Sequence, residues 1–142
     1  MHVSRRIADL TGWDIVMVVV SERIRFRPGW RRVVDAGPSE FLGLLKDAAF
    51  VVTDSFHGTA LAIGNSKPFV AIVDRDLSPV QDRSSRITTL LRLLGLEHRI
   101  LPAGTWHVDE RVLELDYGSP SALLQSERRK SIDFLVHALG GL

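Results

Sequence analysis

The stretch TDSFHGT, residues 53–59, places a carboxylate, a hydroxyl, an aromatic ring and an imidazole in consecutive positions between two apolar runs. The imidazole of His57 can donate or accept a proton near neutral pH, and Asp54 or Ser55 can cap a helix that follows a strand. Free amides at a helix N-terminus favour phosphate or carboxylate groups, and Gly58 permits close approach of another backbone or a ligand. The stretch therefore indicates a site where His57 could exchange a proton with a bound anionic substrate.

A purely structural interpretation of the same residues stays open. A histidine and a serine near a strand end can simply satisfy backbone groups. Asp54 and His57 could also ligate a metal, but the sequence has no third ligand at a recognisable spacing. We therefore predict no metal and no other cofactor.

Two arginines are candidates for binding the anion. Arg83 and Arg86 lie in DRSSR, after the next apolar run and at the start of a helical pattern. We expect both at the same edge of the sheet as His57, where the planar guanidinium suits phosphate and carboxylate. Arg86 is the stronger candidate because it leads directly into the packed helix, whereas Arg83 is equally well explained as a solvated loop residue.

The elements that must position these side chains alternate along the chain. We expect helices at residues 3–10, 38–48, 59–65, 85–95 and 119–141, and strands at residues 14–20, 32–36, 49–53, 68–74 and 97–101. The apolar positions of the candidate at residues 49–53 are continuous instead of alternating, as expected when helices cover both faces of a parallel sheet. The sequence therefore predicts an α/β fold with a Rossmann-like, doubly wound, mostly parallel sheet, whose ligands bind where strands end and helices begin.

The last helical pattern is the longest. Its apolar residues recur at a spacing that predicts an amphipathic helix; they are Leu123, Leu124, Ile132, Leu135 and Leu139.

Composition limits the classes of function. The chain has 142 residues, of which 45% are hydrophobic and 25% charged, which fits one soluble domain and is short for a two-domain enzyme. A net charge of +1 gives no broad surface for nucleic acid. Because the sequence has no cysteine, no signal-peptide pattern and no apolar run long enough for a membrane span, we expect a cytoplasmic protein without disulfides.

Three segments together carry a family resemblance. They are GPSEFLGLLKDAAFVVTDSFHGTALAIGNSKPFVAIV, SSRITTLLRLLGLEHRIL and LDYGSPSALLQSERRKSIDFLVHAL. Over nearly its whole length the chain resembles the C-terminal domain of polysaccharide pyruvyl transferases, and TDSFHGT with GPSEFL upstream and SSRI downstream is the most specific element. The resemblance implies that residues 1–142 form one Rossmann-like half of a glycosyltransferase-B-type architecture, with the N-terminal domain and the first strand absent.

The activity that the resemblance implies is transfer of the enolpyruvyl group of phosphoenolpyruvate onto two hydroxyls of a sugar or polysaccharide. The product is a pyruvate ketal, and the process belongs to exopolysaccharide biosynthesis for the cell envelope. His57 matches the histidine of the family's SFHG motif and is the expected catalytic acid or base. The expected substrate-binding residues are Ser55, Phe56, Gly58, Thr59, Arg83 and Arg86.

Two other functions stay open at this point. A nucleotide-sugar glycosyltransferase half-domain would use the same helix N-terminus for a diphosphate, although no acidic residue for the ribose is evident. A non-catalytic ligand-binding or assembly domain is the second alternative. We also expect the isolated chain to be inactive or weak without an N-terminal domain or partner chain, and an open strand edge at residues 14–20 could lead to a homodimer.

Overall fold

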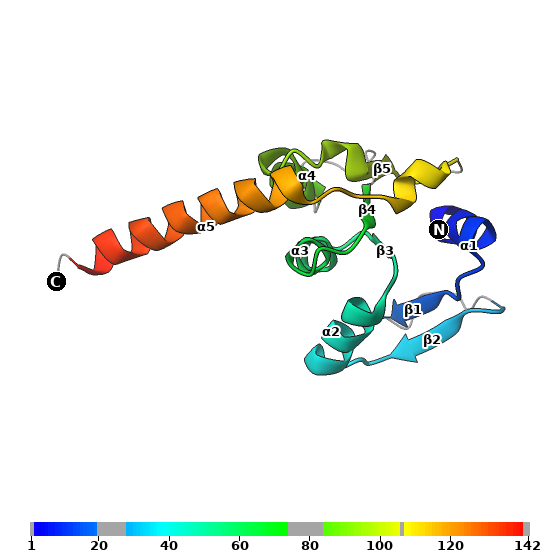
Figure 1. The fold of residues 1–142 in the computed structure, drawn as a ribbon. Helices are drawn as coiled ribbons and strands as arrows, with labels where there is room; N and C mark the ends of the chain where they lie inside the picture. The colour runs from blue at the N-terminus through cyan, green and yellow to red at the C-terminus, as the bar shows by residue number, and fades with distance from the viewer. Residues whose placement is uncertain (1, 20–27, 74–83, 106, 141–142) are drawn as a thin grey trace.

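Helices and strands alternate through the computed structural model, which describes residues 2–19, 28–73, 84–105 and 107–140 (Figure 1). The helices are α1 (His2–Thr11), α2 (Pro38–Asp47), α3 (Phe56–Gly64), α4 (Ser84–Leu93) and α5 (Gly118–Leu139). The strands are β1 (Val16–Val19), β2 (Arg31–Val34), β3 (Val51–Thr53), β4 (Phe69–Val73) and β5 (Ile100–Pro102), and two 3₁₀ turns are η1 (Glu97–Arg99) and η2 (Glu110–Leu113). The predicted order of elements is confirmed, but α3 begins at Phe56 and not at residue 59, and η1 replaces the start of the last predicted strand.

All strand pairs in the described ranges are parallel. β1 pairs with β2, while β3, β4 and β5 form a second sheet with β4 in the centre. Parallel neighbours need crossover connections; α3 supplies the one between β3 and β4, and α4 the one between β4 and β5. The predicted Rossmann-like α/β fold with parallel strands is therefore confirmed, although the strands form two small sheets where we expected one.

The core lies on both faces of β4. Phe69, Ala71 and Val73 are buried among residues of α3 and α4, including Ile87. Val70 points to the opposite face, where it packs with residues of α1. Figure 1, viewed nearly along the strands, shows α3 and α4 on one side and α1 on the other. This double covering explains why the apolar run of β4 is continuous and not alternating.

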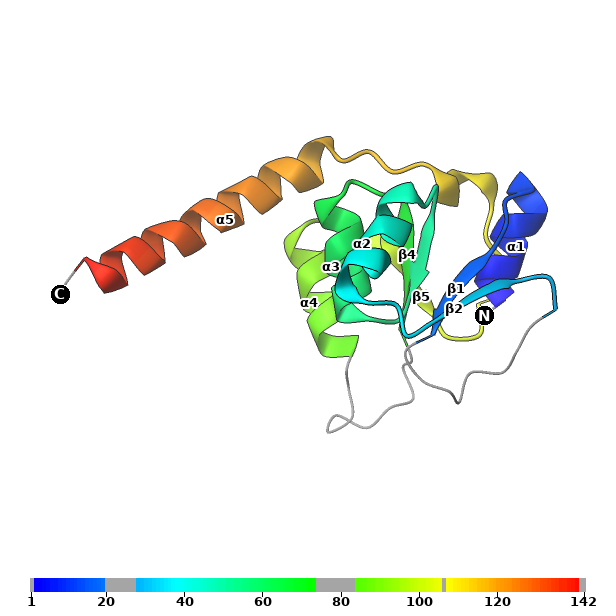
Figure 2. The same ribbon diagram turned by 90° about the horizontal axis from the view of Figure 1, so that it is seen from below.

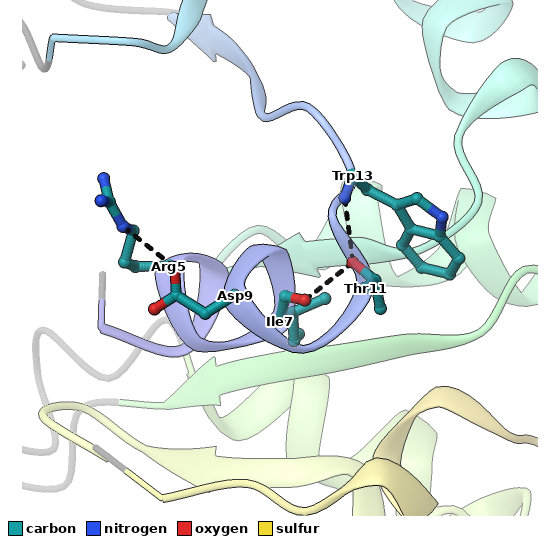
Figure 3. Close-up of polar contacts among 5 residues, drawn as sticks. All are labelled: Arg5, Ile7, Asp9, Thr11 and Trp13. Carbon is teal, nitrogen blue, oxygen red and sulfur yellow. Dashed lines mark hydrogen bonds and ion pairs between the residues drawn. The ribbon is translucent and has the colours of Figure 1, made fainter.

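Helix α1 ends in a turn that directs the chain into β1. The hydroxyl of Thr11 donates to the carbonyl of Ile7 at 2.8 Å and accepts the backbone N–H of Trp13 at 3.2 Å (Figure 3). The exposed face of the helix carries an ion pair between Arg5 and Asp9 at 3.4 Å. Because a surface pair of this kind contributes little, packing of the buried face holds α1 in place.

One buried and one half-buried polar side chain hold the segment that follows β5. The guanidinium of Arg99, 4% exposed, donates through Nη1 to the carbonyl of Val112 at 2.6 Å and through Nη2 to that of Glu114. The hydroxyl of Tyr117 donates to the carbonyl of Lys67 at 2.7 Å. These bonds tie η2 and the start of α5 to the three-stranded sheet.

Most of α5 projects from the domain (Figures 1 and 2). Leu124 packs against the core, but residues 128–139 are all exposed, and Phe134 is 71% and Leu139 67% exposed. Leu135, predicted to lie on the apolar face, is 54% exposed. The helix is present as predicted, but the apolar residues of its outer half are exposed, because this half extends beyond the sheet that could cover them.

Candidate functional site

The turn between β3 and α3 is built from its own hydroxyl groups. Ser55 is the N-cap: its Oγ accepts the N–H of Gly58 at 3.4 Å, and its carbonyl accepts the N–H of Thr59 at 2.9 Å and the hydroxyl of Thr59 at 3.0 Å. The N–H of Ser55 in turn donates to Oγ1 of Thr53 at 3.1 Å. Of the two caps predicted from the sequence, Asp54 or Ser55, the structure uses Ser55.

Gly58 and Thr59 form the inner side of this turn. A Cβ added to Gly58 would lie 2.3 Å from Oγ1 of Thr53, which is much closer than any real contact. The close approach predicted for Gly58 is thus to the side chain of Thr53. Thr59 is fully buried and donates its hydroxyl within the turn. Both residues hold the first turn of α3 in place from beneath.

Three side chains meet on the outer side of the turn. The rings of Phe56 and His57 lie edge to face, with centroids 5.8 Å apart and planes at 80°. The guanidinium carbon of Arg86, in the first turn of α4, lies 5.4 Å from the centroid of the Phe56 ring. His57 and Arg86 are exposed, and Phe56 is half-buried. The packing of α3 against α4 therefore brings a cation and an imidazole to the same aromatic ring.

The backbone of the same turn offers donors to an anion. Within the described part of the chain, the N–H groups of Phe56 and His57 make no hydrogen bond, as expected for the first residues of a helix. The helix dipole adds partial positive charge at this point, and Arg86 adds a full one. An anion such as phosphate or carboxylate is the ligand that these groups favour.

Arg83, the remaining predicted site residue, lies outside the described residues. Asp54, Ser55 and His57 are exposed on an open edge, whereas a shallow hollow of the domain lies elsewhere, between α1, β1 and β3. Among the residues with a described placement, no group of His, Asp and Glu side chains could hold a metal ion, and no helix is long and apolar enough to cross a membrane.

Sequence reasoning missed two features of the site. Thr53 was assigned no role, yet its hydroxyl is both the acceptor for Ser55 and the neighbour that excludes a side chain at Gly58. The stacking of Arg86 on Phe56 was not predicted either. The apolar residue directly before His57 was a possible signal for it, because an aromatic ring at a helix N-terminus offers a face to a neighbouring guanidinium.

A parallel α/β domain with a polar strand-to-helix turn at the carboxyl edge of its strands belongs to the broad class of Rossmann-like domains. The family model described as polysaccharide pyruvyl transferase matches residues 5–75, half of the chain. The matched region runs from α1 to the end of β4 and includes the whole turn at Ser55 and His57. The chain therefore belongs to the polysaccharide pyruvyl transferase family. Searches among curated proteins and among solved structures gave no significant match.

Proposed function

We propose that this domain binds phosphoenolpyruvate at the N-terminus of α3 and takes part in its transfer onto two hydroxyls of a sugar or polysaccharide. Membership of the polysaccharide pyruvyl transferase family supports a role in polysaccharide pyruvylation. The observation that carries the finer proposal is the meeting of Arg86, Phe56 and His57 at a turn whose first two amides bind no other residue in the described ranges. A small substrate with both a phosphate and a carboxylate needs a cation and hydrogen-bond donors, and these groups can supply both.

The reaction sets three chemical demands. A proton adds to the methylene carbon of phosphoenolpyruvate, and the electron-poor central carbon is attacked by the first hydroxyl, which loses its proton to a base. The second hydroxyl then attacks the same carbon, phosphate leaves with the C–O electron pair, and the second hydroxyl proton is released. Two hydroxyls and one enolpyruvyl phosphate thus give one cyclic ketal and one inorganic phosphate. The site must supply an acid, a base and fixed donors for the anionic groups.

His57 is the proposed proton carrier. It is exposed in the first turn of α3, so in this proposal an anion bound at the amides of Phe56 and His57 lies within reach of its side chain. An imidazole that gives its proton to the methylene carbon can take one back from an attacking hydroxyl, so one residue can serve in two steps.

The anion is held by the other groups of the turn in this proposal. Arg86, oriented by Phe56, and the N–H groups of Phe56 and His57 bind the phosphate or the carboxylate, and Ser55 offers its exposed hydroxyl. Gly58 and Thr59 act by keeping the turn in position. Arg83, three positions before Arg86 in the sequence, is a further candidate for the same anion.

Binding of the acceptor sugar needs a second protein surface opposite the proposed site. The proposed site lies on an open edge of the domain, and an edge of this kind cannot hold a donor and a large acceptor together. Alignment of two reactants is worth several kcal/mol, up to about 7–11 in the best cases. We propose that an N-terminal domain or a partner chain supplies the acceptor side, as in a glycosyltransferase-B-type architecture, and that the isolated chain pyruvylates weakly.

Titration of this chain with phosphoenolpyruvate and, in parallel, with a nucleotide sugar tests the proposal. We expect phosphoenolpyruvate to bind more tightly and to shift the NMR signals of the His57 ring and of the Phe56 and His57 amides. Arg92 is a matched control for Arg86 because it is exposed on the same helix, so Arg92→Lys should leave binding unchanged. A preference for the nucleotide sugar would favour a glycosyltransferase, and binding of neither ligand would favour a non-catalytic domain.

A further inference from the structure

Thr53 is held to the core of the domain through its backbone. It is the last residue of β3 and pairs with Ala71 of the central strand β4, which is fully buried. Side chains alternate along a strand, so Thr53 points to the same face as Val51, which packs against the core formed with α3 and α4. The side chain is half-buried, and its branched Cβ leaves it few rotamers. The hydroxyl of Thr53 therefore has a defined place relative to the sheet.

The side chain of Thr53 contacts the chain on both sides of Phe56 and His57. Ahead of them, Oγ1 accepts the N–H of Ser55 at 3.1 Å. Behind them, the backbone of Gly58 lies so close that an added Cβ would be 2.3 Å from Oγ1 and 3.1 Å from Cβ of Thr53. One side chain thus spans the two residues whose amides bind no other residue in the described ranges.

The bond from Ser55 to Thr53 closes a turn of its own. A threonine oxygen that accepts the N–H two residues further on takes the place of a backbone carbonyl and sets the direction of the chain. Ser55 leaves this turn in an extended conformation, with φ −102° and ψ 136°, as an N-cap requires. Because the conformation of the N-cap sets the plane of the next peptide group, it also sets the direction in which the first N–H groups of α3 point.

We propose that Thr53 is a positioning residue of the candidate site: its hydroxyl keeps the N–H groups of Phe56 and His57 in the directions in which they bind one anion together. Two donors that share an anion must converge on it, and small errors in their placement are costly. Thr53 touches no ligand in this proposal and acts through Ser55 and Gly58. The direction of the amides is independent of any ligand, whereas phosphoenolpyruvate as the anion rests on the proposed function.

Two substitutions isolate the hydroxyl of Thr53. Thr53→Ser and Thr53→Ala both lose the methyl group, and they differ from each other by one oxygen atom. Thr11 provides a matched control away from the site, because its hydroxyl likewise accepts the N–H two residues further on, that of Trp13 at 3.2 Å (Figure 3). Thr11→Ala therefore removes a bond of the same kind at the end of α1.

Residual dipolar couplings of the backbone N–H groups measure their directions without a ligand. We expect the couplings of Phe56 and His57, referred to those of β4, to stay unchanged in Thr53→Ser and to change in Thr53→Ala. Hydrogen exchange at the amide of Ser55 should be about two- to tenfold faster in Thr53→Ala, which is the range that corresponds to the loss of one such hydrogen bond. Thr11→Ala should alter none of these values.

Titration with phosphoenolpyruvate connects the geometry with the proposed function. We expect Thr53→Ala to bind phosphoenolpyruvate about fivefold more weakly, and Thr53→Ser and Thr11→Ala to stay within about twofold of the unsubstituted chain. If the unsubstituted chain binds no phosphoenolpyruvate, the proposed function fails, while the couplings of Phe56 and His57 still decide whether Thr53 positions their N–H groups.

Three results would overturn the inference. Unchanged couplings of Phe56 and His57 in Thr53→Ala would show that the hydroxyl does not direct these groups. Changed couplings with an unchanged affinity for phosphoenolpyruvate would show that their direction does not matter for the anion. Equal behaviour of Thr53→Ala and Thr53→Ser would assign the effect to the methyl group.

A measurement on the unsubstituted chain decides the matter if Thr53→Ala does not fold. The amide of Ser55 donates to Thr53, so its hydrogen exchange must be slower than exchange at the amides of Phe56 and His57. Equally fast exchange at all three amides would contradict the inference.

Discussion

The guanidinium carbon of Arg86 lies 5.4 Å from the centre of the Phe56 ring, and the centre of the His57 ring lies 5.8 Å from the same point. An aromatic face that holds a guanidinium restricts the directions in which it can donate hydrogen bonds. The contact therefore restricts the orientation of a cation beside the first residue of α3 before any ligand arrives.

Replacing either member of this pair should weaken anion binding. Arg86→Lys keeps the charge but loses the planar fork, and Phe56→Leu keeps the apolar volume but loses the ring face. We expect each to weaken phosphoenolpyruvate binding about fivefold or more in calorimetric titration, which corresponds to about 1 kcal/mol. Arg92→Lys is the control, and an unchanged affinity in both test variants would remove Arg86 from the site.

His57→Asn should separate rate from binding. In an assembly that carries this domain with its acceptor-binding half, we expect turnover to fall roughly a hundredfold, the usual scale of general acid and base catalysis, with a smaller effect on affinity. The side chain is exposed, so the melting temperature should stay nearly unchanged. His107→Asn, at another exposed histidine, is the control. A lower melting temperature with an unchanged rate per folded molecule would contradict the catalytic role.

Gly58→Ala should destabilise the fold although the position is helical. The new methyl group would lie 2.3 Å from Oγ1 of Thr53, and relief of the clash disturbs the bond from Ser55. We expect a loss of about 1–3 kcal/mol in the free energy of unfolding, measured with denaturant. Gly43→Ala in α2, where nothing lies within 4 Å of the added atom, should be neutral or stabilising. A double variant with Thr53→Ala should recover part of the loss, and an unaffected Gly58→Ala protein would refute the predicted clash.

Tyr117, the single tyrosine of the chain, should titrate late. Burial raises its pKa to about 12, against a smaller opposite effect of the Arg99 charge. Because the folded pKa lies above the ordinary value of about 10, the stability linked to Tyr117 is present below pH ~10 and is lost as the pH rises toward 12. The absorbance of tyrosinate measures the titration directly, and Tyr117→Phe should remove this part of the alkaline loss of stability. An ordinary titration near pH 10 in the folded protein would be inconsistent with the buried hydroxyl.

Two leucines of α5 should differ sharply in their contribution to stability. Leu124 packs against the core, whereas Leu135 is 54% exposed. We expect Leu124→Ala to lower the free energy of unfolding by roughly 1–3 kcal/mol, and Leu135→Ala to change it by less than about 0.5. Equal losses at both positions would mean that the outer half of α5 is covered in solution.

Local sequence patterns were sufficient to predict the order of helices and strands. The continuous apolar run of β4 predicted a strand covered on both faces, and Val70 and Phe69 indeed belong to cores on opposite sides. N-cap residues indicated where helices begin. The predicted start of α3 lay too far along the sequence, because Phe56 and His57 already belong to the first turn of this helix.

Contacts between elements were harder to predict. The stacking of Arg86 on Phe56 depends on how α3 lies against α4, and periodicity carries no information on this. The same holds for Arg99, a residue type that is rarely buried, whose guanidinium binds the carbonyls of Val112 and Glu114. The apolar spacing of α5 correctly predicted a helix, but spacing does not say whether a surface is available to cover it.

The projection of α5 also determines how the molecule moves and scatters in solution. Its 22 residues span about 33 Å, more than twice the radius of gyration of about 14–15 Å typical of a compact chain of this length. The molecule is therefore elongated, with higher friction and a larger maximum dimension than its mass implies. Small-angle scattering would detect the projecting helix in the maximum dimension, and sedimentation would detect it in the frictional ratio. If α5 docked on a partner, the frictional ratio would fall although the mass of the particle increased.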